Sequence, residues 1–232
     1  SKRAVHRPVS DISYSGLSVD EPVEEAVLLP GLIIPTLAIN FPGGLKLTCK
    51  AQVVSCGEIN ENTVRCGLDF LDMDITTYGR LAQLISNTED PGNNISGDLD
   101  LDALWEFFFH TGLIYPKKYK LVKSYIDKFK NIYKKLYQDT PEIAVNFTYE
   151  QNGKILAHLS MLKGYERAWM LHHHAARITS RRSGIGILKL MVNYVNGIYR
   201  LPAPCMQYVM CYFRPDNHFP EMVYGKFARE HN

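Results

Sequence analysis

The sequence predicts a two-domain protein, with an N-terminal all-β domain followed by a C-terminal α/β domain built on a mixed sheet with flanking helices. Three observations predict this fold class. Short apolar runs separated by Pro, Gly and Asn turns fill residues 1–75. Residues 87–98, NTEDPGNNISGD, have the composition of a linker. Beyond them, apolar residues recur first at helical spacing and then in strand-like runs.

The N-terminal part has the pattern of short strands joined by tight turns. In residues 45–52 apolar side chains alternate with Lys, Thr and Gln, which is typical of a strand with one buried face. We expect strands at Ala26–Leu29, Leu32–Phe41, Leu45–Val54 and Thr63–Phe70, followed by one short helix at Thr76–Ser86.

The C-terminal part is predicted to contain two helices, three strands, a helix, a strand and a last helix. The second helix is the clearest, because Tyr119, Val122, Ile126, Phe129, Tyr133 and Leu136 are three or four residues apart. The strands are expected at Ile143–Glu150, Lys154–Leu162, Arg167–Ala176 and Cys205–Phe213, and the later helices at Gly186–Tyr199 and Phe219–Arg229. The predicted domains are therefore 1–86 and 99–232, joined by the linker 87–98.

Composition narrows the classes of function. The formal net charge is only +2, which indicates neither a nucleic-acid polymer nor a membrane surface as partner. The most apolar stretch, Ala26–Phe41, is interrupted by Pro30, Gly31 and Pro35 and is too short to span a bilayer. The start of the chain is polar and basic, unlike a signal peptide. We therefore expect no membrane span.

The cysteines indicate a reducing compartment. Their number is odd and none forms a C-x-x-C pair: Cys49, Cys56, Cys66, Cys205 and Cys211. Disulfide frameworks belong to oxidising compartments, so the sequence predicts a cytoplasmic protein. It does not predict an oligomeric state.

A glycine-bearing segment lies between the third predicted strand of the second domain and the helix after it. Its residues are Arg181, Arg182, Ser183, Gly184, Ile185 and Gly186. Glycine lets the backbone approach a ligand closely, and amides at a helix start favour an anion such as a pyrophosphate. Alone, the same pattern also fits an ordinary strand-to-helix turn.

With its element order, this segment resembles the GNAT superfamily of N-acyltransferases over residues 99–232. The resemblance implies that acyl-coenzyme A (acyl-CoA) is the acyl donor and that its pyrophosphate binds the amides of residues 182–186. It also implies that an amine attacks the thioester and that Tyr224 protonates the leaving thiolate. Equally, Tyr224 fits a core aromatic residue. The chain ends after the helix that precedes the last two strands in that family, and the sequence leaves open whether its C-terminus is truncated.

Three consecutive histidines, His172, His173 and His174, precede the glycine segment. On a regular strand His172 and His174 point to one face and His173 to the other, so one metal ion cannot bind all three. We predict no metal site. His172 or His174 is a candidate general base for the amine, because histidine titrates near neutrality, while packing roles stay open.

The start of the chain carries a second motif. Asp11, Ser13 and Gly16 match D-x-S-x-x-G, followed by Pro30-Gly31, a strand and a short helix. This resembles the PilZ domain, a small β-barrel that binds cyclic di-GMP. The resemblance implies that Asp11, Ser13 and Gly16 hold a guanine base. An Asp/Ser-rich turn closed by Gly is the structural alternative.

Two arginines, Arg3 and Arg7, have the R-x-x-x-R spacing with which PilZ domains clamp the nucleotide phosphates. Only three residues separate Arg7 from Asp11, whereas the family usually places a whole strand there. Either the start of the domain lies outside this chain, or the two arginines match by chance.

The sequence therefore predicts a cytoplasmic, acyl-CoA-dependent N-acyltransferase that responds to cyclic di-GMP. The alternative is a cyclic di-GMP receptor whose second domain binds a ligand or partner without catalysis. A third reading is a pair of structural domains with no ligand. The sequence names neither the acyl group nor the amine acceptor.

Overall fold

The computed structural model describes residues 5–97, 99–213 and 218–230. The chain forms two compact units: unit 1 is Ser1–Ile95 with Lys189–Cys205, and unit 2 is Ser96–Leu188 with Met206–Asn232. This division differs from the predicted one in two respects. The expected linker holds the end of helix α1 (Ile75–Glu89) and strand β6 (Asn93–Ile95), and a C-terminal segment belongs to unit 1.

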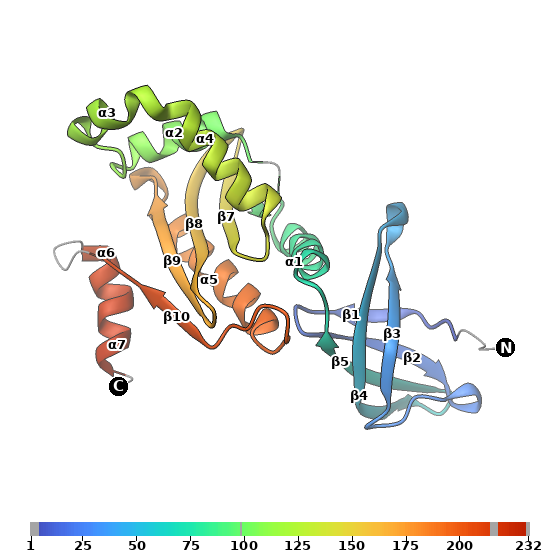
Figure 1. Ribbon diagram of the computed structural model, residues 1–232. Helices are drawn as coiled ribbons and strands as arrows, with labels where there is room; N and C mark the ends of the chain where they lie inside the picture. The colour runs from blue at the N-terminus through green and yellow to red at the C-terminus, as the bar shows by residue number, and fades with distance from the viewer. Residues whose placement is uncertain (1–4, 98, 214–217, 231–232) are drawn as a thin grey trace. The chain divides into compact units, whose positions relative to one another are not determined.

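Unit 1 contains one antiparallel sheet in the order β1-β2-β5-β4-β3 (Figure 1). Each pair in this order is hydrogen-bonded along its length. Its strands are β1 (Val9–Ile12), β2 (Gly16–Pro22), β3 (Ile33–Asn40), β4 (Lys46–Asn60) and β5 (Thr63–Asp72).

The β-barrel predicted for the N-terminal domain is not closed in the described part of unit 1. Closure requires the two edge strands to exchange hydrogen bonds, but β1 and β3 stand at opposite edges of the sheet. With only four residues, β1 offers too short an edge to complete a barrel. The N-terminal fold is therefore an open five-stranded sheet.

The strand predictions for unit 1 hold in part. β3 and β5 lie close to the predicted bounds, whereas β4 runs on to Asn60 because it pairs with β5 up to their connecting turn. The predicted strand Ala26–Leu29 is wrong. The backbone amides of Val27 and Leu28 donate to the buried carboxylate of Glu21 instead of to a neighbouring strand.

Two helices complete unit 1. Asp74 caps α1 by accepting a hydrogen bond from the amide of Thr77 at 2.9 Å. The Tyr78 hydroxyl, on α1, donates to the Tyr194 carbonyl at 2.7 Å. Tyr194 lies in the second half of α5 (Arg181–Ile198). A Cβ at Gly197 would lie 2.2 Å from that hydroxyl, so glycine is required for this approach.

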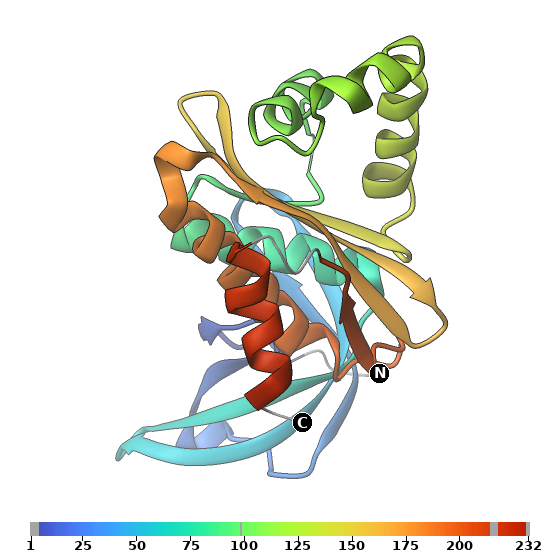
Figure 2. The same ribbon diagram turned by 90° about the vertical axis from the view of Figure 1, so that its left-hand side faces the viewer.

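Unit 2 is built on a mixed sheet in which β7 to β10 lie in the order β10-β9-β8-β7. β10 is parallel to β9, and the other two pairs are antiparallel. In Figure 2, α2, α3 and α4 cover one face and the first turns of α5 the other. The strands are β7 (Ala144–Gln151), β8 (Lys154–Tyr165), β9 (Ala168–Ala176) and β10 (Tyr208–Cys211).

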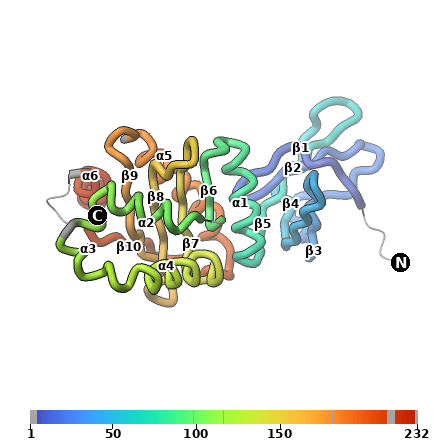
Figure 3. Tube along the Cα trace, turned by 90° about the horizontal axis from the view of Figure 1, so that it is seen from above, coloured from blue at the N-terminus to red at the C-terminus, as the bar shows by residue number. Residues whose placement is uncertain are grey.

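The long helix predicted from Tyr119 to Leu136 is two helices. A 3-10 turn at Lys123–Tyr125 separates them, since serine and aromatic residues are weaker helix formers. Figure 3 shows α2 and α4 running across the strands. The helices of this layer are α2 (Leu101–His110), α3 (Pro116–Val122) and α4 (Ile126–Lys134).

The described chain ends in a helical segment beside β10. It consists of α6 (His218–Pro220), a π-helical turn (Glu221–Gly225) and α7 (Lys226–Glu230), close to the predicted Phe219–Arg229. None of the helices in the described residues has the length and apolarity to cross a bilayer.

Candidate active site and nucleotide site

A cavity of about 650 Å³ opens in unit 2 where β9 ends and α5 begins. The loop after α2 and the C-terminal helical segment complete its walls. Its volume lies within the range of ordinary small-molecule pockets. The lining residues that matter here are His174, Arg177, Gly184, Ile185, Phe219 and Met222.

The predicted glycine loop 181–186 is helical. A 3-10 turn at Ile178–Ser180 leads directly into α5, which begins at Arg181. Within a helix each amide donates to the carbonyl four residues earlier, and the residue before the helix accepts the first of these bonds, so the amides of Gly184, Ile185 and Gly186 are used inside α5. The amides of Arg182 and Ser183 have no such partner in the helix and lie at its positive dipole end.

Gly184 has a packing role of its own. It is buried, and a Cβ there would lie 3.1 Å from the Cβ of Ala176 on β9. Glycine therefore lets α5 begin close to the end of β9. A Cβ at Gly186 would have no atom within 4 Å, so only Gly184 of the two glycines has this packing role.

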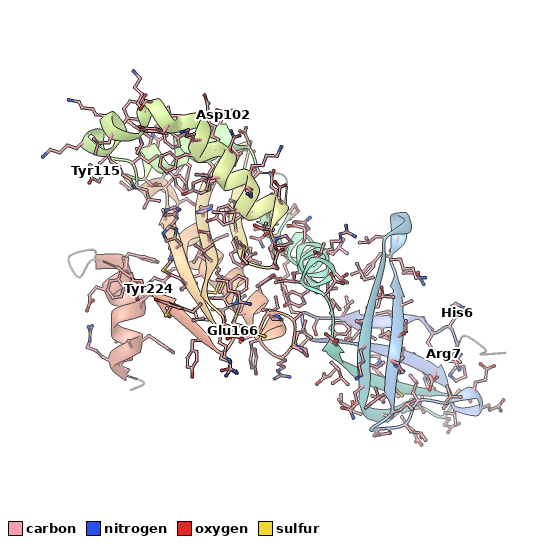
Figure 4. All side chains as sticks on the ribbon, viewed as in Figure 1. His6, Arg7, Asp102, Tyr115, Glu166 and Tyr224 are labelled. Carbon is pink, nitrogen blue, oxygen red and sulfur yellow. The ribbon has the colours of Figure 1, made fainter. Side chains whose placement is uncertain are left out.

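His174 and Tyr224 form a hydrogen-bonded pair beside the cavity. The Nε2 atom of His174 lies 2.9 Å from the Gly184 carbonyl, which can only accept, so Nε2 carries the hydrogen. The neutral ring then leaves Nδ1 as acceptor for the Tyr224 hydroxyl at 2.6 Å. Tyr224 stands on the helical segment next to β10 (Figure 4).

Burial favours the neutral forms of both side chains. It lowers the pKa of His174, although the bond to Gly184 acts in the opposite direction. It also raises the pKa of Tyr224, and the neighbouring Cys211 raises that pKa further. The pair is thus a phenol that donates to a neutral imidazole.

The predicted alternation of the three histidines is wrong because β9 contains a bulge. Between the pairs Ser160–His172 and His158–Ala175, β9 has one extra residue, and His173 has a φ of 53°. His172 and His173 consequently lie with their rings 3.8 Å apart on the side of α2 to α4. His174 points to the opposite side, toward α5.

The histidines on the α2 side are held neutral. Nδ1 of His173 is 2.7 Å from the Tyr133 hydroxyl on α4, and burial lowers its pKa to about 3. His158 donates from Nδ1 to the His173 carbonyl, and burial lowers its pKa to about 4. Burial and the nearby Lys118 also lower the pKa of His172. None of these three lines the 650 Å³ cavity.

Two residues of the site were not predicted. Arg177 follows β9, donates from Nε to the Ile155 carbonyl at 2.8 Å and lines the cavity, which brings positive charge near the α5 start. Cys211 ends β10 beside Tyr224, and burial raises the pKa of its thiol. Their positions, Arg177 just after a strand and Cys211 at the end of one, were the available signal. Within residues 5–97, 99–213 and 218–230, no group of side chains has the arrangement of a metal site.

In unit 1, the predicted nucleotide residues build a hairpin turn between β1 and β2. The Ser13 hydroxyl donates to the Gly16 carbonyl at 3.1 Å and accepts from the Gly16 amide. A Cβ on Gly16 would lie 2.3 Å from the Leu68 carbonyl, so glycine permits the pairing with β5. Asp11 accepts from the Ser18 hydroxyl at 2.7 Å. Asp11 and Ser13 are exposed.

Arg7 is held by a buried carboxylate. Its Nε donates to Glu21 at 2.9 Å, and a second nitrogen donates to the Glu25 carbonyl at 2.9 Å (Figure 4 labels Arg7). The Glu21 side chain has no exposed surface and also accepts the amides of Val27 and Leu28. Arg3 lies outside the described residues.

Comparison with protein families decides the identity of the first part of the chain. The PilZ domain model matches residues 1–87. Residues 1–87 are a PilZ domain. This confirms the predicted resemblance, and the match ends one residue beyond the predicted boundary at 86.

An exposed arginine of this PilZ domain was missed from the sequence. Arg65 on β5 forms two hydrogen bonds with Asp20 on β2, at 2.7 and 2.9 Å. The hydrogen bond from Arg65 is the main cause that lowers the pKa of Asp20. Arg65 thus places a cation on β5, the strand that pairs with β2 after the Asp11 turn.

Solved structures of acetyltransferases are similar to this chain. One is a probable acetyltransferase, 14% identical, covering 58% of this chain and 87% of its own, with a TM-score of 0.42. An acetyltransferase from Streptococcus agalactiae is 10% identical and covers 60% and 82%, with a TM-score of 0.41. A ribosomal-protein-alanine N-acetyltransferase from Brucella melitensis is 14% identical and covers 58% and 89%, with a TM-score of 0.37.

Similarity at this level says nothing about the activity of this chain. No curated protein matches its sequence.

Proposed function

We propose that unit 2 transfers an acyl group from acyl-CoA to an amine, and that the PilZ domain makes this transfer responsive to cyclic di-GMP. The observation that carries the first part is the cavity at the start of α5. The start of α5, Arg177 and His174 line this cavity, and the half-buried Tyr224 is hydrogen-bonded to His174.

The helix start supports binding of the pyrophosphate. The amides of Arg182 and Ser183 lie at the positive end of the α5 dipole, and Arg177 lines the same cavity. We assign the pyrophosphate to these two amides, in place of the five amides predicted from the sequence. The acyl thioester then extends into the cavity toward His174.

Tyr224 supplies the acid in the proposed transfer. The amine nitrogen attacks the thioester carbon, the C–S bond breaks, and the thiolate takes the Tyr224 proton after rotation of the hydroxyl. The amine loses its proton to water, from which Tyr224 is reprotonated, so atoms and protons balance. Its raised pKa keeps Tyr224 protonated at neutral pH.

His174 acts in this proposal as a positioning residue. Both of its ring nitrogens are engaged, one by Gly184 and one by Tyr224, so it orients the phenol instead of taking the amine proton. His172, the other predicted base, lies on the α2 side of the sheet. The two predicted bases therefore do not act together.

One observation favours the non-catalytic alternative. Among the described residues, neither predicted base offers an unengaged nitrogen to the cavity, because His174 is fully hydrogen-bonded and His172 lies elsewhere. A receptor in which unit 2 only binds a ligand or partner fits this arrangement. Turnover with acyl-CoA and an amine separates the two functions.

A charge placed at the α5 start tests the acyl-CoA site. Ile185 is 59% exposed and lines the cavity, so Ile185→Glu adds a negative charge without opening the core. We expect acyl-CoA affinity to fall at least about tenfold. The added carboxylate would repel the pyrophosphate and would itself occupy the position where the helix dipole favours an anion. Calorimetric titration of the full chain is the measurement.

Ile185→Gln is the matched control, since it has the same shape without the charge. Its affinity for acyl-CoA should stay within about threefold of wild type, which is less than the roughly 1.4 kcal/mol of binding free energy that a tenfold change requires. Equal affinities for the Glu and Gln variants would exclude the α5 start as the pyrophosphate site.

The Asp11 turn tests the PilZ part of the proposal. Asp11→Ala removes an exposed carboxylate whose hydrogen bond to guanine is expected to contribute about 1.5–3 kcal/mol. Affinity for cyclic di-GMP should therefore fall about ten- to a hundredfold. Asp72→Ala, at the exposed end of β5, is the control and should bind as wild type does. An unchanged Asp11→Ala affinity would refute the assignment.

A further inference from the structure

Two cysteines face each other across the β4–β5 hairpin of the PilZ domain. Cys56 and Cys66 are direct cross-strand partners, and their sulfur atoms lie 2.6 Å apart. A disulfide bond is about 2.05 Å long, so the sulfurs need to move only about half an ångström to bond. Both are free thiols in the structure.

The two thiols have different surroundings. Cys66 is fully buried, whereas Cys56 is partly exposed and its sulfur lies 3.5 Å from the Leu28 carbonyl. Burial, followed by the neighbouring Cys56, raises the pKa of Cys66 to about 12. An oxidant from solvent therefore reaches Cys56 first, and Cys66 is placed to react second.

We propose that this cysteine pair is an oxidative modification site at which peroxides form an internal disulfide. Hydrogen peroxide oxidises the Cys56 thiol to a sulfenic acid and is reduced to water. The Cys66 sulfur then attacks the Cys56 sulfur and displaces a second water, so that two thiols and one peroxide give one disulfide and two waters. No electron carrier beyond the peroxide is needed.

The bond would join β4 to β5, and β5 pairs with β2, the strand that carries Glu21, the partner of Arg7. Cys66 pairs with Val19 on β2, and Glu21 lies two residues further along the same face of that strand. The charge on Glu21 contributes to the raised pKa of Cys66, which places the carboxylate near the thiol. Oxidation thus fixes the β4–β5 register next to the buried Arg7–Glu21 ion pair.

Intact mass spectrometry of the full chain tests this site. A variant with Cys49, Cys205 and Cys211 replaced by serine keeps only the pair. After treatment with hydrogen peroxide it should lose about 2 Da and become resistant to iodoacetamide until it is reduced. Its thermal unfolding midpoint should rise, on the order of 10 °C, because the closed hairpin restricts the unfolded chain.

The single variants Cys56→Ser and Cys66→Ser in this background are the controls. They should show neither the mass loss nor the rise in midpoint. The proposal is overturned if the two-cysteine variant keeps both thiols open to iodoacetamide after peroxide treatment. It is also overturned if peroxide yields only sulfinic or sulfonic acids on Cys56, or only disulfides between two chains.

Discussion

Replacing Tyr224 by phenylalanine should lower kcat for acyl transfer by about 10²- to 10⁴-fold, the usual loss when a positioned proton donor is removed. Among the described residues, the Tyr224 hydroxyl is the only group that donates a hydrogen bond to the His174 ring. Tyr224 does not line the cavity itself. Affinity for acyl-CoA should therefore change little. Release of free coenzyme A thiol, followed with a thiol reagent, measures kcat.

Tyr208→Phe is the matched control for this experiment. Tyr208 begins β10 in the same unit, but its side chain is exposed and makes no hydrogen bond to His174. It should keep wild-type kcat. If Tyr224→Phe also keeps kcat within about twofold, Tyr224 is not the acid, because the expected loss is at least a hundredfold.

Replacing Glu21 by alanine should cost the PilZ domain about 3–5 kcal/mol of its free energy of unfolding, since it leaves a partly buried cation without its partner. The carboxylate also accepts two backbone amides, which would lose their acceptor. Urea unfolding followed by far-ultraviolet circular dichroism measures the effect. Both tryptophans, Trp105 and Trp169, belong to unit 2 and would not report on it.

Glu25→Ala provides the comparison on the same arginine. The Glu25 carboxylate is 68% exposed and lies 3.6 Å from Arg7, so its loss should change stability far less. Similar unfolding curves for the two variants would show that the Arg7–Glu21 pair does not anchor the first segment of the domain.

The sequence predicted most strands and helices because hydrophobic periodicity survives in the fold. Residues 45–52 alternate and form part of β4, and the three strands before the glycine segment lie close to their predicted bounds. Periodicity could not show that Lys123–Tyr125 interrupts a helix, or that Glu21 holds residues 27 and 28 out of a strand. The first depends on local helix propensity and the second on hydrogen bonds to a side chain, and the spacing of apolar residues records neither.

The candidate site shows the same limit. His174, Tyr224 and Gly184 were predicted separately, and the fold brings them into one hydrogen-bonded set. The bulge at His173 places the side chains of His172 and His173 on one face of the sheet and that of His174 on the other. One extra residue in a strand changes the alternation of every residue after it. Arg177 and Cys56–Cys66 gained their significance only from strand pairing and packing.

Cyclic di-GMP control of acyl-CoA binding is the central claim, and one titration tests it most directly. Acyl-CoA species of several chain lengths are titrated into the full chain with and without saturating cyclic di-GMP. We predict saturable acyl-CoA binding whose dissociation constant changes about 5- to 150-fold with the nucleotide, the range of a typical coupling free energy of about 1–3 kcal/mol. Absence of saturable binding for every acyl-CoA, or identical dissociation constants with and without the nucleotide, would contradict this account.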